Sequence, residues 1–135
     1  MTAVASTAKG KILEIRQNQV IFQPAGTTYQ LHLQTQGDPG PVGVPVECVI
    51  RVCARKIYTV PSGGNFIQPI FGPPRIIQGR VRAIQGQELI VHAGVPITVV
   101  LPSEPHAIDL TRGEIAEGSL VNVVALPGAT VEFTR

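Results

Sequence analysis

An internal repeat is the feature that most constrains the fold of this 135-residue chain. Four blocks of the first half recur in the second half at nearly constant separations, and each block keeps its order of apolar and polar positions. Such a repeat limits the fold to architectures that can be built twice from about 60 residues. The matched blocks are residues 10–15 with 79–84 and 19–22 with 88–91 at a separation of 69, 25–33 with 93–101 at 68, and 46–57 with 120–131 at 74.

A regular alternation of side chains marks the late strand of the first copy. Between residues 46 and 55, apolar side chains hold every even-numbered position. A two-residue period predicts a β-strand with one buried face, and β-branched residues favour strands. Each copy predicts five short strands, the pattern of a small OB-type barrel. We therefore predict an all-β fold of two tandem small OB-like β-barrels related by an internal repeat, in residues 1–60 and 75–135.

Residues 61–74 separate the two copies and are predicted to form a Pro/Gly-rich apolar linker. Four prolines and three glycines exclude a regular helix in this segment. The linker also contains Phe66, Ile67, Ile70 and Phe71, whereas a free tether is normally rich in glycine, serine or charged residues. We expect these four side chains to be buried, either between the barrels or against a neighbouring subunit.

Charge is distributed unevenly, although the formal net charge is only +2. Residues 48–82 contain six basic and no acidic side chains, and residues 83–135 contain two basic and six acidic ones. A basic block can be a solvated surface, or it can attract an anion or a nucleic-acid backbone on which aromatic side chains stack. The candidate ligand- or partner-binding residues are Arg51, Arg55, Lys56, Tyr58, Phe66, Phe71, Arg75, Arg80 and Arg82.

The opening of each copy carries a family resemblance. The G-[KR]-[IV] segments at residues 10–12 and 79–81, together with a late V-x-x-x-[IV]-[RK] strand, resemble the molybdate-binding MOP and TOBE domains. The doubled length is similar to that of the di-domain molbindins. The resemblance implies a pair of OB-like barrels in a ring-like oligomer, with oxyanions held at subunit interfaces. Neither copy contains the S-A-R-N segment of that family, and only the first has cations at the end of its late strand, Arg55 and Lys56.

No motif in the sequence specifies a reaction. The patterns H-x-H, H-E-x-x-H, C-x-x-C, G-x-S-x-G and the P-loop are all absent, so we predict no catalytic residues, no metal site and no cofactor. Cys48 and Cys53 lie five positions apart on one predicted strand and should point to opposite faces, which leaves both as free thiols. Cys53 is flanked by Arg51 and Arg55, but a small side chain that fills space is the favoured role for it.

The sequence favours a binding or assembly protein over an enzyme. No apolar run is long enough to span a bilayer and the first ten residues lack the core of a secretory signal, so we expect a cytoplasmic protein without membrane association. The favoured function is a non-enzymatic tandem-barrel module that self-associates as a homo-oligomer or binds a protein partner. Two alternatives stay open: a single-stranded nucleic-acid-binding OB protein and a small oxyanion-binding protein.

Overall fold

A computed structural model describes residues 7–35, 38–102, 108–109 and 114–133. Twelve strands form one mixed sheet, and the described part of the chain contains no helix, so the all-β prediction is confirmed. The strands are β1 (Ala8–Arg16), β2 (Gln19–Pro24), β3 (Gln30–Thr35), β4 (Pro45–Thr59), β5 (Phe66–Gln68), β6 (Phe71–Gly72), β7 (Ile76–Gln85), β8 (Glu88–His92), β9 (Pro96–Val100), β10 (Ile108–Asp109), β11 (Leu120–Ala125) and β12 (Thr130–Phe133).

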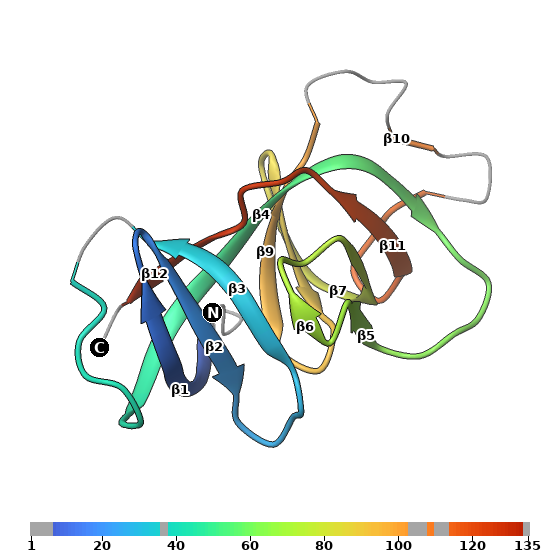
Figure 1. The fold of residues 1–135 in the computed structure, drawn as a ribbon. Helices are drawn as coiled ribbons and strands as arrows, with labels where there is room; N and C mark the ends of the chain where they lie inside the picture. The colour runs from blue at the N-terminus through green and yellow to red at the C-terminus, as the bar shows by residue number, and fades with distance from the viewer. Residues whose placement is uncertain (1–6, 36–37, 103–107, 110–113, 134–135) are drawn as a thin grey trace.

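The long strand β4 runs through both halves of the molecule (Figure 1). Its even-numbered residues from Cys48 to Ala54 are buried, as the alternation in the sequence predicts. A register shift opposite Val124 and Ala125 then leaves Arg55 as an extra residue on β4. Beyond this bulge the odd-numbered residues turn inward and Ile57 is completely buried.

Strand pairing makes two closed circuits that share β4. In the first, β1, β2 and β3 form an antiparallel meander, β3 pairs in parallel with β12, and β12 and β1 both pair antiparallel with β4. In the second, β7, β8 and β9 form the meander, β9 pairs in parallel with β4, and β11 joins β4 to β7. Each circuit therefore contains one strand segment from the other half of the chain, so pairing crosses the predicted boundaries at residues 60 and 75.

The two meanders have the same register at a separation of 69. Ile12 lies opposite Phe22 in the first, and Val81 lies opposite Val91 in the second. The irregularity in each pairing also falls at matching positions, directly after Ile12 and Val81. The late strands match with an offset one residue different from that of the sequence alignment. Lys11 and Arg80 occupy matching positions, and their partners on the late strands are Pro45 and Leu120. These late strands therefore match at a separation of 75 rather than the predicted 74.

Two glycines allow the first strand of each meander to approach its neighbour closely. A Cβ atom added at Gly10 would lie 2.2 Å from the carbonyl oxygen of Gln23, and one added at Gly79 would lie 2.2 Å from that of His92. Real Cβ atoms do not approach a backbone oxygen so closely, so only glycine fits either position.

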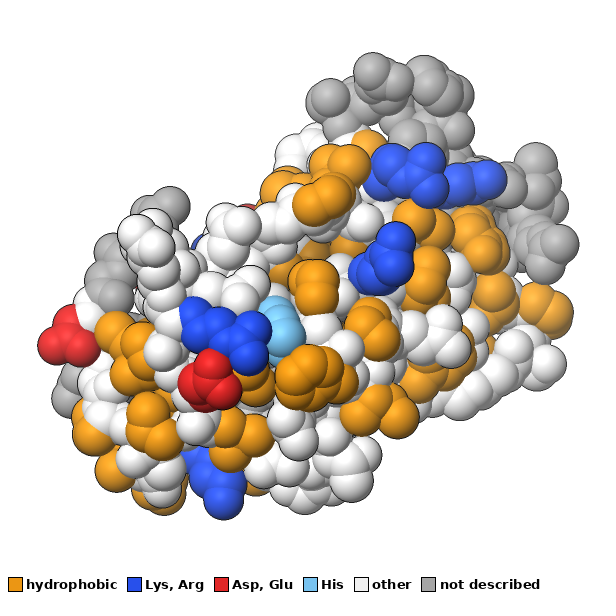
Figure 2. Space-filling model, viewed as in Figure 1, with side chains coloured by type: hydrophobic (Ala, Val, Ile, Leu, Met, Phe, Trp, Pro, Cys, Tyr) orange, Lys and Arg blue, Asp and Glu red, His pale blue; other side chains and the backbone are white. Residues whose placement is uncertain are grey.

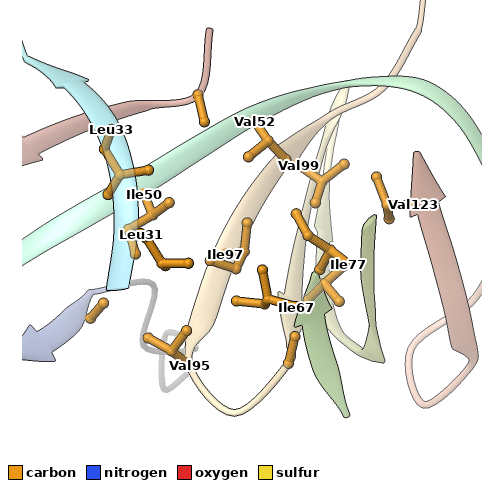
Figure 3. Packing of buried hydrophobic residues seen from close by; sticks show 14 of the residues in the cluster. Leu31, Leu33, Ile50, Val52, Ile67, Ile77, Val95, Ile97, Val99 and Val123 are labelled. Atoms are coloured by element: carbon orange, nitrogen blue, oxygen red, sulfur yellow. The ribbon is translucent and has the colours of Figure 1, made fainter. Parts of the chain in front are cut away.

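Most of the buried apolar side chains form one hydrophobic cluster across both circuits (Figure 3). Leu31 and Ile50 belong to the first circuit, and Val99 and Val123 to the second. Ile67 of the linker strand β5 joins the same cluster and is 1% exposed. The linker is thus part of the packed interior rather than a free tether.

Candidate functional site

The linker is held to both circuits by backbone hydrogen bonds. Strand β5 pairs antiparallel with β7, and β6 pairs in parallel with β3. The Ile67 N–H donates to the Tyr29 hydroxyl at 3.0 Å, and the Gln30 N–H donates to the carbonyl of Ile70 at 2.7 Å. These bonds hold the linker backbone in one place, so the side chains it exposes have a defined position.

Of the four apolar linker side chains, which we expect to be buried between the barrels or against a neighbouring subunit, two are not buried within this chain. Ile67 is buried and Phe66 is half-buried, but Ile70 and Phe71 are 57% and 56% exposed. The pleat of a strand explains part of the difference, because β6 turns Gly72 inward and therefore Phe71 outward. Burial of the exposed pair against a neighbouring subunit stays a prediction.

An open surface pocket lies beside Ile70. Its volume is about 680 Å³, and Ile70 forms part of its wall. We call the cavity and the exposed Ile70 and Phe71 together the linker face. The cavity is lined by Thr28, Tyr29, Phe66, Ile67, Gln68, Pro69, Ile70 and Arg75.

The ring of Phe71 covers a histidine on the outside of β3. It meets the imidazole of His32 edge to face, with the ring centroids 4.6 Å apart. Burial lowers the pKa of His32, the nearby positive charge of Arg16 lowers it further, and Glu14 partly opposes both effects. The Nε2 atom of His32 is buried and has no hydrogen-bond partner among the described residues. This environment favours the neutral imidazole.

Three of the predicted cationic residues lie on backbone segments that both pair with β11: Arg55 and Lys56 on β4, and Arg75 directly before β7. Arg55 sits at the bulge of β4 beside Lys56, and the carbonyl of Arg75 accepts a 2.8 Å hydrogen bond from Ala125 on the intervening strand β11. All three cations are exposed, and we call them the basic patch. Figure 2 shows Lys and Arg side chains gathered over the second half of β4.

Tyr58 borders this basic patch, but its side chain already contacts Lys56 and Asn122. The Lys56 Nζ atom lies 5.6 Å from the centroid of the Tyr58 ring, a cation–π distance. The Tyr58 hydroxyl accepts a 2.9 Å hydrogen bond from the side-chain amide of Asn122. Tyr58 therefore supports Lys56 and offers only part of its ring to a ligand.

The other predicted cations lie apart from the basic patch or have partners. Arg51 forms a 3.4 Å ion pair with Glu88, and Arg80 donates a 2.9 Å hydrogen bond to the carbonyl of Gly118. Arg82 is an exposed residue of β7, seven positions after Arg75. In an extended chain, seven positions separate two residues by up to about 23 Å. The structure thus assembles three of the six predicted cations into one surface.

A larger groove, about 950 Å³ in volume, was missed by sequence reasoning. Its lining comes from several separate segments, and its two lysines lie outside the basic block of residues 48–82. The only signal in the sequence is the pair of lysines that flank Gly10. The lining residues are Lys9, Gly10, Lys11, Gln23, Pro24, Ala25, Gly26, Thr27, Pro39, Gly40, Pro41, Val44, Pro45, Val46, Glu47 and Phe133.

The two cysteines differ in accessibility, as their spacing predicts. Cys48 is buried, which raises the pKa of its thiol to about 12, and Cys53 is exposed. Both are free thiols. Within the described ranges, no group of three His, Cys, Asp or Glu side chains could hold a metal ion. In that same part of the chain, no helix has the length and apolar character needed to cross a membrane.

The chain matches no known family model, and no curated protein matches it either.

Proposed function

We propose that the chain is a non-enzymatic module of two OB-like barrels, related by an internal repeat, that exchange their fifth strands. The proposal is supported by the two closed circuits, each of which contains a three-strand meander and one parallel pair. The common register and the matched positions of Gly10 and Gly79 support a repeat. On this view β12 completes the first barrel, and residues 51–53 of β4 complete the second.

The module self-associates through the linker face. The observation that carries this proposal is the exposed Ile70–Phe71 pair, which lies on a backbone held by hydrogen bonds and of which Ile70 lines an open pocket of mixed polar and apolar character. A protruding apolar pair next to a cavity is self-complementary, since in a two-fold contact the pair of each copy can enter the cavity of the other. Aromatic side chains that enter preformed cavities contribute strongly to such interfaces.

Light scattering over a range of protein concentrations tests this assembly. We expect the wild-type protein to form a homo-oligomer, and the double variant Ile70→Ser, Phe71→Ser to be a folded monomer. The control is Ile15→Ser with Ile84→Ser, because these side chains are 44% and 43% exposed but lie outside the linker face. A wild-type protein that stays monomeric, or an oligomer that only the control variant disrupts, would contradict self-association through the linker face. The same linker face could instead bind a different protein, which is the other way in which the module would act in assembly.

The basic patch supports a second candidate function, binding of single-stranded nucleic acid. Its three exposed cations can neutralise phosphates, and Tyr58 can contribute limited stacking. A labelled single-stranded oligonucleotide should then shift in a gel, and added salt should abolish the shift. Replacing Arg55, Lys56 and Arg75 by glutamine should remove binding with little effect on stability, since exposed charges are worth less than about 1 kcal/mol to folding. The oxyanion alternative predicts instead that titration with molybdate gives heat that the same triple variant loses.

A further inference from the structure

His32 connects the outer side of β3 with the linker face. Its neighbours Leu31 and Leu33 are completely buried, so the pleat of the strand turns the His32 side chain outward. There the imidazole meets the ring of Phe71, with the ring centroids 4.6 Å apart and the ring planes at 79°. Phe71 is nevertheless 56% exposed, so much of its surface is open to another molecule. One side chain of the linker face therefore rests on a titratable group.

The Nε2 atom of His32 makes this contact sensitive to protonation. It is buried and has no hydrogen-bond partner among the described residues. In a neutral imidazole one ring nitrogen is a bare acceptor, whereas in the imidazolium both nitrogens donate. A buried charged donor without an acceptor costs more free energy than a neutral unpaired group. Protonation of His32 is therefore unfavourable until water or another acceptor reaches Nε2.

The charges around His32 add to this cost. Among the described residues, the charged groups that act on the imidazole are Arg16 and Glu14, both on β1. Glu14 favours the imidazolium, but its carboxylate is already paired with the Arg16 guanidinium. The outer neighbours on the other strands carry no charge, since Ile21 is opposite His32 on β2 and Phe71 lies on β6. Burial first, and then Arg16, therefore lower the pKa of His32, and Glu14 offsets only part of the effect.

Phe71 can leave His32 without disturbing the hydrophobic cluster. Strand β6 has only two residues, of which Gly72 is buried and Phe71 is exposed. The linker is anchored to the interior at another residue, Ile67, which is 1% exposed. Rotation of the Phe71 side chain into solvent would admit water to Nε2 and leave β5 in place. Such a rotation accommodates a proton on His32 by a local change.

We propose that His32 and Phe71 form a pH-sensitive contact that controls the linker face. Neutral His32 holds the Phe71 ring in the orientation that assembly uses, and a proton on His32 releases the ring into solvent. Acid then weakens assembly, and assembly in turn opposes protonation of His32, because coupling between two equilibria is reciprocal. The effect on assembly rests on the proposed self-association. The coupling of His32 to Phe71 lies within one molecule and does not depend on it.

An NMR titration of the His32 imidazole tests the coupling within one molecule. The midpoint is compared between Ile70→Ser, which keeps Phe71, and Ile70→Ser with Phe71→Ser, at a concentration where light scattering shows both to be monomers. We expect His32 to titrate at a higher pH in the double variant, because water then reaches Nε2. The matched control is Ile70→Ser with Ile84→Ser, which removes a side chain that is 43% exposed outside the linker face and should leave the midpoint unchanged. Equal midpoints with and without Phe71 would overturn the proposal.

Light scattering of the wild-type protein at different pH values tests the effect on assembly. Below the His32 midpoint, the dissociation constant should rise by about tenfold per pH unit for each proton bound on dissociation. His32→Gln should form the oligomer with little change over the same pH range. An oligomer whose pH dependence is the same in wild type and His32→Gln would overturn control of assembly by His32. A wild-type protein that is monomeric at every pH would refute self-association instead, and the NMR comparison would still decide whether His32 and Phe71 are coupled.

Discussion

Ile67 and Ile70 provide a test of the linker that uses one residue type in two environments. Ile67 is 1% exposed within the hydrophobic cluster, and Ile70 is 57% exposed on the surface. Replacing a buried isoleucine by alanine removes about three methylene equivalents, worth about 2.4 kcal/mol in transfer free energy. The cavity left behind raises the cost to about 3 to 4 kcal/mol. We therefore expect Ile67→Ala to be strongly destabilising and Ile70→Ala to change the unfolding free energy by less than about 0.5 kcal/mol.

Urea unfolding followed by circular dichroism measures both variants, with a Phe71→Ser background used for both if association complicates the transition. For a chain of this size, the unfolding free energy lost in Ile67→Ala corresponds to a decrease of about 10 °C in Tm. The transition should stay single, because one cluster spans both circuits. Equal effects of the two substitutions would refute the claim that β5 belongs to the interior. Two separate transitions in the wild-type protein would refute the claim that the circuits unfold as one body.

Three further predictions use other features of the structure. Gly10→Ala and Gly79→Ala should each destabilise the protein severely in thermal unfolding, whereas Gly64→Ala should have little effect, since nothing lies within 4 Å of its added Cβ. In the native protein Cys53 should react with Ellman's reagent at pH 8, and Cys48, with a pKa of about 12, should react only after unfolding; a fast phase that survives Cys53→Ser would contradict this. Because the folded-state pKa of His32 is lowered, its contribution to stability is present above its ordinary value of 6.5 and is lost as pH falls below that value. In urea unfolding, His32→Gln should therefore lose less stability between pH 7 and pH 5 than the wild-type protein does. An unchanged pH dependence would contradict this role of His32.

The strands could be predicted from the sequence because their signal is local. The alternation around Cys48 and Ile50 indicates a strand with one buried face, and that face is buried. Alternation does not indicate which strand will be the neighbour. The pairing of β12 with β3 joins residues about a hundred positions apart, and nothing in the sequence of residues 130–133 specifies it. The pairing of strands from the two halves was therefore not predictable.

The candidate site could be predicted only in part for the same reason. Arg55 and Lys56 are adjacent in sequence, so their association is local, and Arg75 joins them through the pairing of β11. Arg51 looked equivalent to Arg55, but it meets Glu88 through strands that are distant in sequence. The groove around Lys9 is formed by loops and strands from several parts of the chain, so it became visible only in three dimensions.

The strand pairing also explains why the exposed linker residues are free to act between molecules. The orientation of the two circuits is set by β4, which passes through both, and by β12, which returns to the first. Ile67 adds buried contact at their junction. Ile70 and Phe71 are therefore not needed to hold the circuits together, and Phe71 stays 56% exposed in spite of its edge contact with His32. An exposed apolar pair that contributes little to folding, on a backbone fixed at 2.7 Å to Gln30, is better explained by contact with another molecule. This reasoning supports the proposed assembly, and it requires the double serine variant to keep the wild-type Tm of the monomer while it loses the oligomer.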